Sequence, residues 1–277
     1  MENTLIKKTI HLNGIDIYYE SYQQHRSSRK TIVLLHGFLS SCFSFRKLIP
    51  YLMTEFDIIS IDLPPFGNSG KSRRFKYSYK NLAATIIQLI ESLHLRKVTL
   101  LGHSMGGQIA LNIAHLRPDL IDGIILLCSS AYMKKSPLRL VIASYMPFSH
   151  FLIKRLLEKS GLENNLKLVV FDQSMIDREM EEGYLAPFLN DQIFPALTKL
   201  IRDREGDLTA EVLKKIDTPC LLIWGEEDKV VPLHIGRQLR KDLKNAELIV
   251  LKKTGHLVPE ERPEEVFQLI EDFIHKG

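Results

Sequence analysis

Short apolar runs alternate along this chain with stretches of helical periodicity. The runs are nearly continuous in Val, Ile and Leu, which is typical of parallel strands covered on both faces. They are residues 31–35, 58–61, 98–101, 123–128, 220–224 and 248–251. Helical patterns lie at residues 44–53, 79–93, 107–115, 234–243 and 264–275. This alternation predicts an α/β fold with a doubly wound, mostly parallel sheet.

Two regions depart from the alternation. Residues 5–22 predict a β-hairpin, because Asn13-Gly14 favours a type I′ turn and the residues after it alternate in polarity. Between about residues 131 and 216 the pattern is helix-like, with no strong strand. We therefore predict an eight-stranded core of residues 1–130 and 217–277, with a helical cap of residues 131–216 inserted into it.

Charge and cysteine content exclude several classes of protein. The formal net charge is +4, without a dense run of Lys or Arg, so we expect no nucleic-acid partner. Cys42, Cys128 and Cys220 are far apart and lack CxxC spacing, which indicates neither a disulfide framework nor a zinc site. Cys128 and Cys220 lie in apolar strand-like runs, which indicates buried thiols. The N-terminus has no apolar signal core and no apolar stretch approaches a bilayer span, so the expectation is a cytoplasmic protein. The oligomeric state is left open.

Residues 102–106, with the sequence Gly-His-Ser-Met-Gly, are the most informative stretch. They join a predicted strand to a predicted helix, the context that a nucleophile elbow needs. A strained turn there would expose the hydroxyl of Ser104 at the carboxyl edge of the sheet, in front of a helix N-terminus. Gly106, Ala110 and Ala114 share one helix face and would let this helix approach the sheet closely. A tight turn with an idle serine is the alternative.

A serine hydroxyl needs a base, and a base needs a partner that orients it. His256 follows the apolar run 248–251 and is the best-placed histidine, although an exposed loop histidine is the alternative. Asp228 follows the run 220–224 and is our choice of acid, with Glu226 and Glu227 as competitors in what is otherwise a solvated acidic turn. Each of the three residues would stand just after a core strand.

An oxyanion formed during acyl transfer needs hydrogen-bond donors, each worth about 3 kcal/mol of transition-state stabilisation. His36-Gly37-Phe38 ends the first predicted parallel strand. We expect the backbone N–H groups of Phe38 and Met105 to form this oxyanion hole. We expect His36 to brace the loop rather than transfer a proton.

These segments, together with residues 62–69, resemble the α/β-hydrolase superfamily, in its lidded branch of small serine esterases and carbon–carbon hydrolases. The resemblance covers about residues 30–130 and 217–275. It implies a hydrolase that cleaves a carboxylic ester with a mainly apolar acyl group through an acyl-enzyme, with no metal or organic cofactor. Serine at the elbow argues against the dehalogenases and epoxide hydrolases of this fold, which use aspartate there. Pro65 stands where the family carries glycine.

Other functions remain open at this point. The same residues would serve a carbon–carbon bond hydrolase or a thioesterase, and hydrolase-like proteins also act as ligand receptors or stress-signalling regulators. Within the predicted cap, residues 138–159 combine apolar and basic side chains. This pattern indicates either a solvated face over a packed stripe or weak contact of the cap with a membrane surface.

Overall fold

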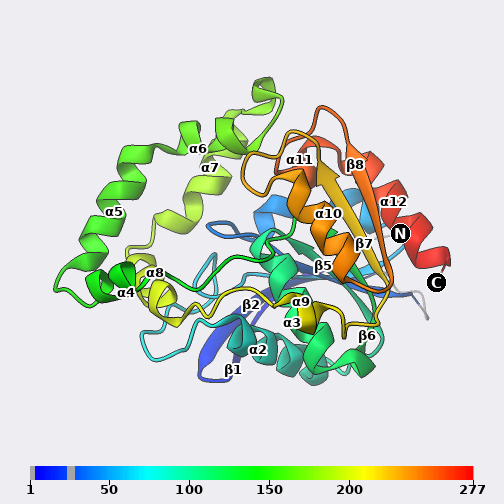
Figure 1. The fold of residues 1–277 in the computed structure, drawn as a ribbon, viewed down its shortest axis with the longest axis horizontal. Helices are drawn as coiled ribbons and strands as arrows, with labels where there is room; N and C mark the ends of the chain where they lie inside the picture. Colours follow the sequence, from blue (N-terminus) through cyan, green and yellow to red (C-terminus); the bar gives the residue numbers. More distant parts are fainter. Residues whose placement is uncertain (1–3, 24–28, 277) are drawn as a thin grey trace.

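The computed structural model describes residues 4–23 and 29–276, apart from the side chains of residues 4, 158–160 and 162–163. An eight-stranded sheet runs through the molecule in the order β1-β2-β4-β3-β5-β6-β7-β8 (Figure 1). Pairs β1–β2 and β2–β4 are antiparallel, and the remaining pairs are parallel. The strands are β1 (Thr4–Leu12), β2 (Ile15–Gln23), β3 (Thr31–Leu35), β4 (Asp57–Ile61), β5 (Val98–His103), β6 (Ile121–Leu127), β7 (Cys220–Gly225) and β8 (Ala246–Leu251). The predicted fold class is confirmed.

Continuous apolar runs form the central strands because both faces of these strands are covered. Every residue of β5 and β7 is buried, so neither strand has a polar face. The hairpin β1–β2 instead alternates in burial along β2, as its sequence predicts. Helices of the sheet region are α1 (Ile49–Leu52), α2 (Tyr79–Ser92), α3 (Met105–Leu116), α10 (Leu233–Asp242), α11 (Val258–Glu261) and α12 (Pro263–Lys276), with 3₁₀ turns η1 (Cys42–Phe45) and η2 (Pro118–Leu120).

The single helix predicted over residues 44–53 is wrong. The chain forms η1, capped by the side chain of Ser41, and then begins α1 separately with Pro50 in its first turn. Proline has no N–H, so a continuous helix would lose a hydrogen bond at Pro50 and meet a steric clash with the preceding turn. A helix that starts just before the proline avoids both costs.

Between β6 and β7 the chain leaves the sheet and forms helices. They are α4 (Leu138–Ser144), α5 (Ser149–Ser160), α6 (Leu162–Val169), α7 (Arg178–Leu185), α8 (Ile193–Asp203) and α9 (Ala210–Leu213), with η3 (Gln173–Met175) and η4 (Ala186–Phe188). Helices α4 and α5 pack on α8, and α6 packs on α7. Among the described residues of 131–216 the structure has no strand, only an isolated bridge between Lys134 and Gly206. The division into a core and a cap stays a prediction.

Helix α3 lies very close to the sheet. A Cβ atom added at Gly106 would lie 2.0 Å from the carbonyl oxygen of Leu35 in β3. One added at Gly102 would lie 2.5 Å from the backbone of Gly106 and Gly107. Glycine at these positions therefore lets the start of α3 touch the backbone of the central strands, which confirms the close approach expected from the small-residue face.

We predict that Gly106→Ala destabilises the fold by about 1–3 kcal/mol, because backbone atoms of β3 cannot move aside as a flexible side chain can. The free energy of unfolding from denaturant titration measures the change. Gly123→Ala is the matched control, since its nearest obstacle is the Phe273 ring at 3.0 Å. Equal stability of the two variants would contradict the close-contact explanation.

Candidate active site

Ser104 occupies a strained turn between β5 and α3. Its φ of 51° and ψ of −117° lie in a region that non-glycine residues rarely adopt. The backbone N–H of Ser104 donates to the carbonyl of Leu127 at 3.0 Å, and the Ser104 carbonyl accepts from the N–H of Ser130 at 3.0 Å. The end of β6 and the loop after it therefore hold the turn in this conformation. Ser104 has the backbone geometry that the elbow motif predicts.

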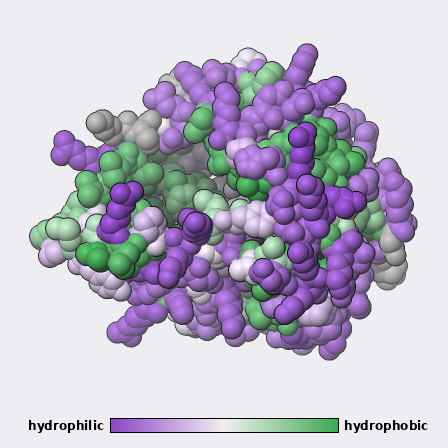
Figure 2. All heavy atoms as spheres, in the orientation of Figure 1, coloured by the Kyte–Doolittle hydropathy of each residue, from purple (hydrophilic) through white to green (hydrophobic). Residues whose placement is uncertain are grey.

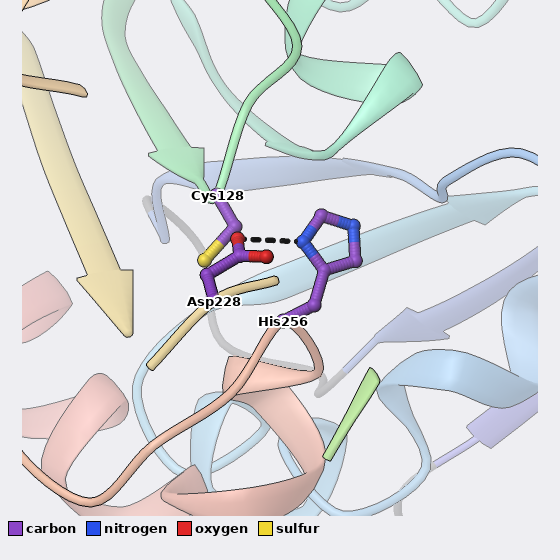
Figure 3. Close-up of side chains that lie close together, drawn as sticks. All are labelled: Cys128, Asp228 and His256. Atoms are coloured by element: carbon purple, nitrogen blue, oxygen red, sulfur yellow. Dashed lines mark hydrogen bonds and ion pairs between the residues drawn. The ribbon is translucent and has the colours of Figure 1, made fainter. Parts of the chain in front are cut away.

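Asp228 and His256 form a buried hydrogen-bonded pair. The His256 Nδ1 lies 2.7 Å from Oδ2 of Asp228, and Figure 3 shows the two side chains meeting across adjacent loops. The other carboxylate oxygen of Asp228 accepts from the N–H groups of Val230 and Val231 at 2.8 and 2.9 Å. Burial raises the pKa of Asp228, but the hydrogen bond and charge of His256 outweigh it, so this pKa lies below its ordinary value. An ionised Asp228 fixes an Nδ1–H tautomer of His256.

The competing acidic residues have other roles. Glu227 accepts hydrogen bonds from the backbone N–H groups of Lys253 and Thr254, at 3.1 and 2.8 Å, and so holds the loop that carries His256. Glu226 is exposed. Of the three acids after β7, the structure therefore places only Asp228 on the imidazole.

The loop of His256 also contacts the predicted cap. The N–H of His256 donates to the carbonyl of Val169, at the end of α6, at 2.7 Å. Glu261 joins the same two segments, because its carboxylate accepts from Gly255 and from Phe171, each at 2.8 Å. The position of His256 thus depends on residues far away in the sequence, which no local pattern indicates.

His103 supports His256 in a way that sequence reasoning missed. Its ring lies 4.8 Å from the His256 ring, and its Nε2–H donates to the backbone carbonyl of His256 at 2.9 Å. Burial lowers the pKa of His103 to about 3, so its ring is neutral at physiological pH. The only signal in the sequence was its place beside Ser104 at the end of a strand.

The loop after β3 lies against Ser104. A Cβ added at Gly37 would lie 3.2 Å from Cβ of Ser104, which brings the backbone next to Phe38 close to the turn. The His36 ring accepts from the N–H of Leu63 at 2.8 Å and donates to the carbonyl of Gly37 at 2.7 Å. These hydrogen bonds hold the loop in place, which is the structural role expected of His36. Met105 begins α3, so its N–H belongs to the first turn, whose donors have no partner within the helix. The oxyanion-hole role of Phe38 and Met105 stays a prediction.

A cavity of about 870 Å³ opens onto Ser104 and His256. The loops of the sheet contribute Gly37, Phe38, Leu39, Ser40, His103, Val230 and Leu257 to its wall. The predicted cap contributes Lys154, Leu157, Asn165, Leu166, Leu168, Val169, Tyr184, Leu185, Phe188, Leu189, Asp191 and Phe194. Most of these residues are apolar, and the two Lys or Asp side chains among them, Lys154 and Asp191, pair with each other at 2.7 Å. Such a wall suits an apolar ligand with few polar groups.

Cys128 lies against the pair of Asp228 and His256, and Figure 3 shows the three side chains together. One ligand atom of each lies within 4.8 Å of the others, a spacing that would suit a metal ion. Burial and the charge of Asp228, however, raise the pKa of the Cys128 thiol well above its usual value, and a metal requires the thiolate. Since Asp228 and His256 already bind each other, the three residues fit a hydrogen-bonded cluster better than a metal site.

Comparison with known proteins gives a consistent result. Residues 30–263 match the family described as alpha/beta hydrolase fold. The chain is 52% identical over 263 residues to the hydrolase YugF of Bacillus subtilis (strain 168), covering 95% of this chain and 96% of that protein. It is 25% identical to the monoacylglycerol lipase abhd6-B of Xenopus laevis, over 94% of this chain and 82% of the lipase. The esterase EaEST of Exiguobacterium antarcticum shares the fold, with a TM-score of 0.80, 20% identity and coverage of 98% and 100%.

We predict that the thiols of the native protein do not react with a disulfide reagent such as DTNB at about pH 8. Burial raises the pKa of Cys220 to about 12 and that of Cys42 well above its usual value, as it does for Cys128, so thiolates are scarce as well as shielded. Absorbance of the released thiolate measures the reaction, and unfolding in denaturant should release all three thiols. A thiol that reacts rapidly in the native state would contradict the assigned surroundings.

Proposed function

This chain belongs to the alpha/beta hydrolase family and is a hydrolase, and we propose that it is a serine hydrolase acting on carboxylic esters with a mainly apolar acyl group. One observation carries the proposal. A buried, ionised Asp228 holds His256 at 2.7 Å, and His256 shares a cavity with Ser104 on its strained turn. This combination matches the base and orienting acid that a serine nucleophile requires.

In the proposed first step, the substrate lies in the cavity with its carbonyl carbon beside Ser104. His256 accepts the hydroxyl proton at Nε2 as the serine oxygen attacks this carbon. Asp228 stabilises the imidazolium that results, because its carboxylate stays ionised. The N–H groups of Phe38 and Met105 donate to the oxyanion of the tetrahedral intermediate.

In the proposed second step, His256 donates its proton to the leaving alcohol as the carbon–oxygen bond breaks. The acyl group stays on Ser104. A water molecule then gives its proton to His256 and attacks the acyl carbon, and the collapse of the second intermediate returns the proton to Ser104 and releases the carboxylic acid. No cofactor takes part in either step.

The apolar cavity wall supports the choice of substrate. Leu166, Leu185 and Phe188 come from the predicted cap and face the same cavity as Ser104. Binding there would remove the apolar surface of an acyl chain from water, which is favourable. A charged acyl group would lose its hydration and find few polar partners in this wall. The similarity to a monoacylglycerol lipase adds support for an ester substrate.

We predict that Ser104→Ala and His256→Ala each lower kcat for p-nitrophenyl ester hydrolysis by at least about 10³-fold. Removing either one disables proton transfer and nucleophilic attack together, so the double variant should be little worse than the single ones. Ser92→Ala is the control, because this exposed serine lies on α2, outside the cavity. Circular dichroism checks that every variant remains folded.

A fluorophosphonate should label the wild-type protein and the Ser92→Ala variant but not Ser104→Ala. A folded Ser104→Ala variant that keeps wild-type turnover would overturn the proposal. Full activity of His256→Ala would do so too, since no other described histidine has a buried carboxylate at hydrogen-bond distance.

We also predict that kcat/KM rises with acyl length from acetyl to octanoyl esters. Each methylene of the acyl chain that is buried in the cavity contributes about 0.8 kcal/mol to binding. Leu185→Glu would place a carboxylate beside these methylenes, so it should lower kcat/KM for the octanoyl ester at least about tenfold and change the value for the acetyl ester little. Leu185 is partly exposed, so the variant should fold. The control is Leu116→Glu on α3, away from the cavity. An equal loss for both esters would argue against an acyl site there.

A further inference from the structure

Exposed apolar side chains gather at one end of the molecule. Among α4, α5 and the turn between them, Leu138 and Phe148 are each 72% exposed and Tyr145 is 68% exposed. The other large apolar residues exposed there are Leu140, Ile142, Met146, Phe151, Leu152 and Leu156. Figure 1 places α4 and α5 at the end of the molecule farthest from α12, and Figure 2 shows hydrophobic residues at that end. We call residues 138–157 the apolar tip.

The apolar tip has the shape of a projecting corner. The chain bends by 112° between α4 and α5, and Tyr145, Met146 and Phe148 lie in the turn at this corner. Among the described residues, no single helix is long and apolar enough to cross a membrane. Side chains on such a corner can enter the outer layer of a bilayer while both helices stay at its surface.

The stretch of sequence that carries the apolar tip is basic, although Glu158 follows it directly and Lys154 pairs with Asp191. From Gly123 to Leu157 the sequence contains no Asp or Glu but five basic residues, Lys134, Lys135, Arg139, Lys154 and Arg155. The whole chain carries only +4, so this stretch accounts for more than its entire net charge. Arg139 and Arg155 are exposed beside the apolar side chains. Anionic lipid headgroups attract such cations, and the attraction adds to the burial of apolar side chains.

We propose that the apolar tip docks on the surface of an anionic lipid bilayer. A second copy of this chain is a poorer occupant, because a symmetric contact would bring the same positive charges face to face. A bilayer accepts both the apolar side chains and the surrounding cations.

Docking would place the bilayer near the cavity. Lys154 and Leu157 of α5 line the cavity that reaches Ser104, so the helix that contacts lipid on its exposed face also forms part of the cavity wall. An acyl ester would then have a short path from the membrane to the site, a consequence that rests on the proposed function. The docking itself does not depend on catalysis.

Vesicle co-sedimentation tests the proposal. The Ser104→Ala protein, used so that no ester is cleaved, should bind vesicles of phosphatidylglycerol and phosphatidylcholine and bind pure phosphatidylcholine much less. Reversing two charges with Arg139→Glu and Arg155→Glu should lower the partition coefficient at least about tenfold. Phe148→Asp should also lower it, and Asp tolerates the φ of 62° at this position. Matched controls on α10, Arg237→Glu with Arg240→Glu, should bind as the parent does.

Three results would overturn the proposal. They are no binding to the anionic vesicles, equal binding by the Arg139/Arg155 and Arg237/Arg240 variants, and a dimer in light scattering that Phe148→Asp separates. The last would make a second copy the occupant. Hydrolysis of a short soluble ester, measured without vesicles in proteins that keep Ser104, should be unchanged by Arg139→Glu, Arg155→Glu and Phe148→Asp. Failure of the esterase proposal therefore appears in a different assay from failure of docking.

Discussion

The strained turn at Ser104 is the constraint on which the arrangement of the site depends. A non-glycine residue in such a conformation costs about 1–3 kcal/mol, and the surrounding structure has to supply that energy. Here the backbone of Ser104 is hydrogen-bonded on both sides, to Leu127 and Ser130, while Gly106 lets α3 press against β3. Because parallel strands end at one edge of the sheet, a turn held there meets the loops after β3, β7 and β8.

Burial disfavours the charged form of every ionisable group around this turn, and polar partners decide which group is charged nevertheless. His103 has only a backbone carbonyl as its partner, so burial leaves it neutral with a lowered pKa. Asp228 is buried as well, yet the His256 imidazole and two backbone N–H groups keep it ionised. Cys128 lies beside that carboxylate and stays a thiol. Polar partners, more than burial, thus decide which group of the cluster carries charge.

The helices of the predicted cap form both part of the cavity wall and an exposed apolar surface. Leu166, Leu185 and Phe188 face inward to the cavity, whereas the corner at Phe148 faces solvent. Contacts of Val169 with the N–H of His256, and of Phe171 with Glu261, attach these helices to the site itself. Movement of α6 would therefore also disturb the imidazole, which links access to the cavity with the geometry of the proposed base.

Sequence alone determined the parts that depend on neighbours along the chain. Continuous Val, Ile and Leu runs predicted the buried strands, and the Gly-His-Ser-Met-Gly turn predicted the strained Ser104, because periodicity and backbone conformation are local properties. Only the tertiary structure decided that Asp228 rather than Glu227 meets His256, and that His103 holds its carbonyl. Those contacts join segments separated by many residues. Glu227 and Asp228 are neighbours in the sequence, so which of the two carboxylates reaches His256 depends on the direction of each side chain after the strands have packed.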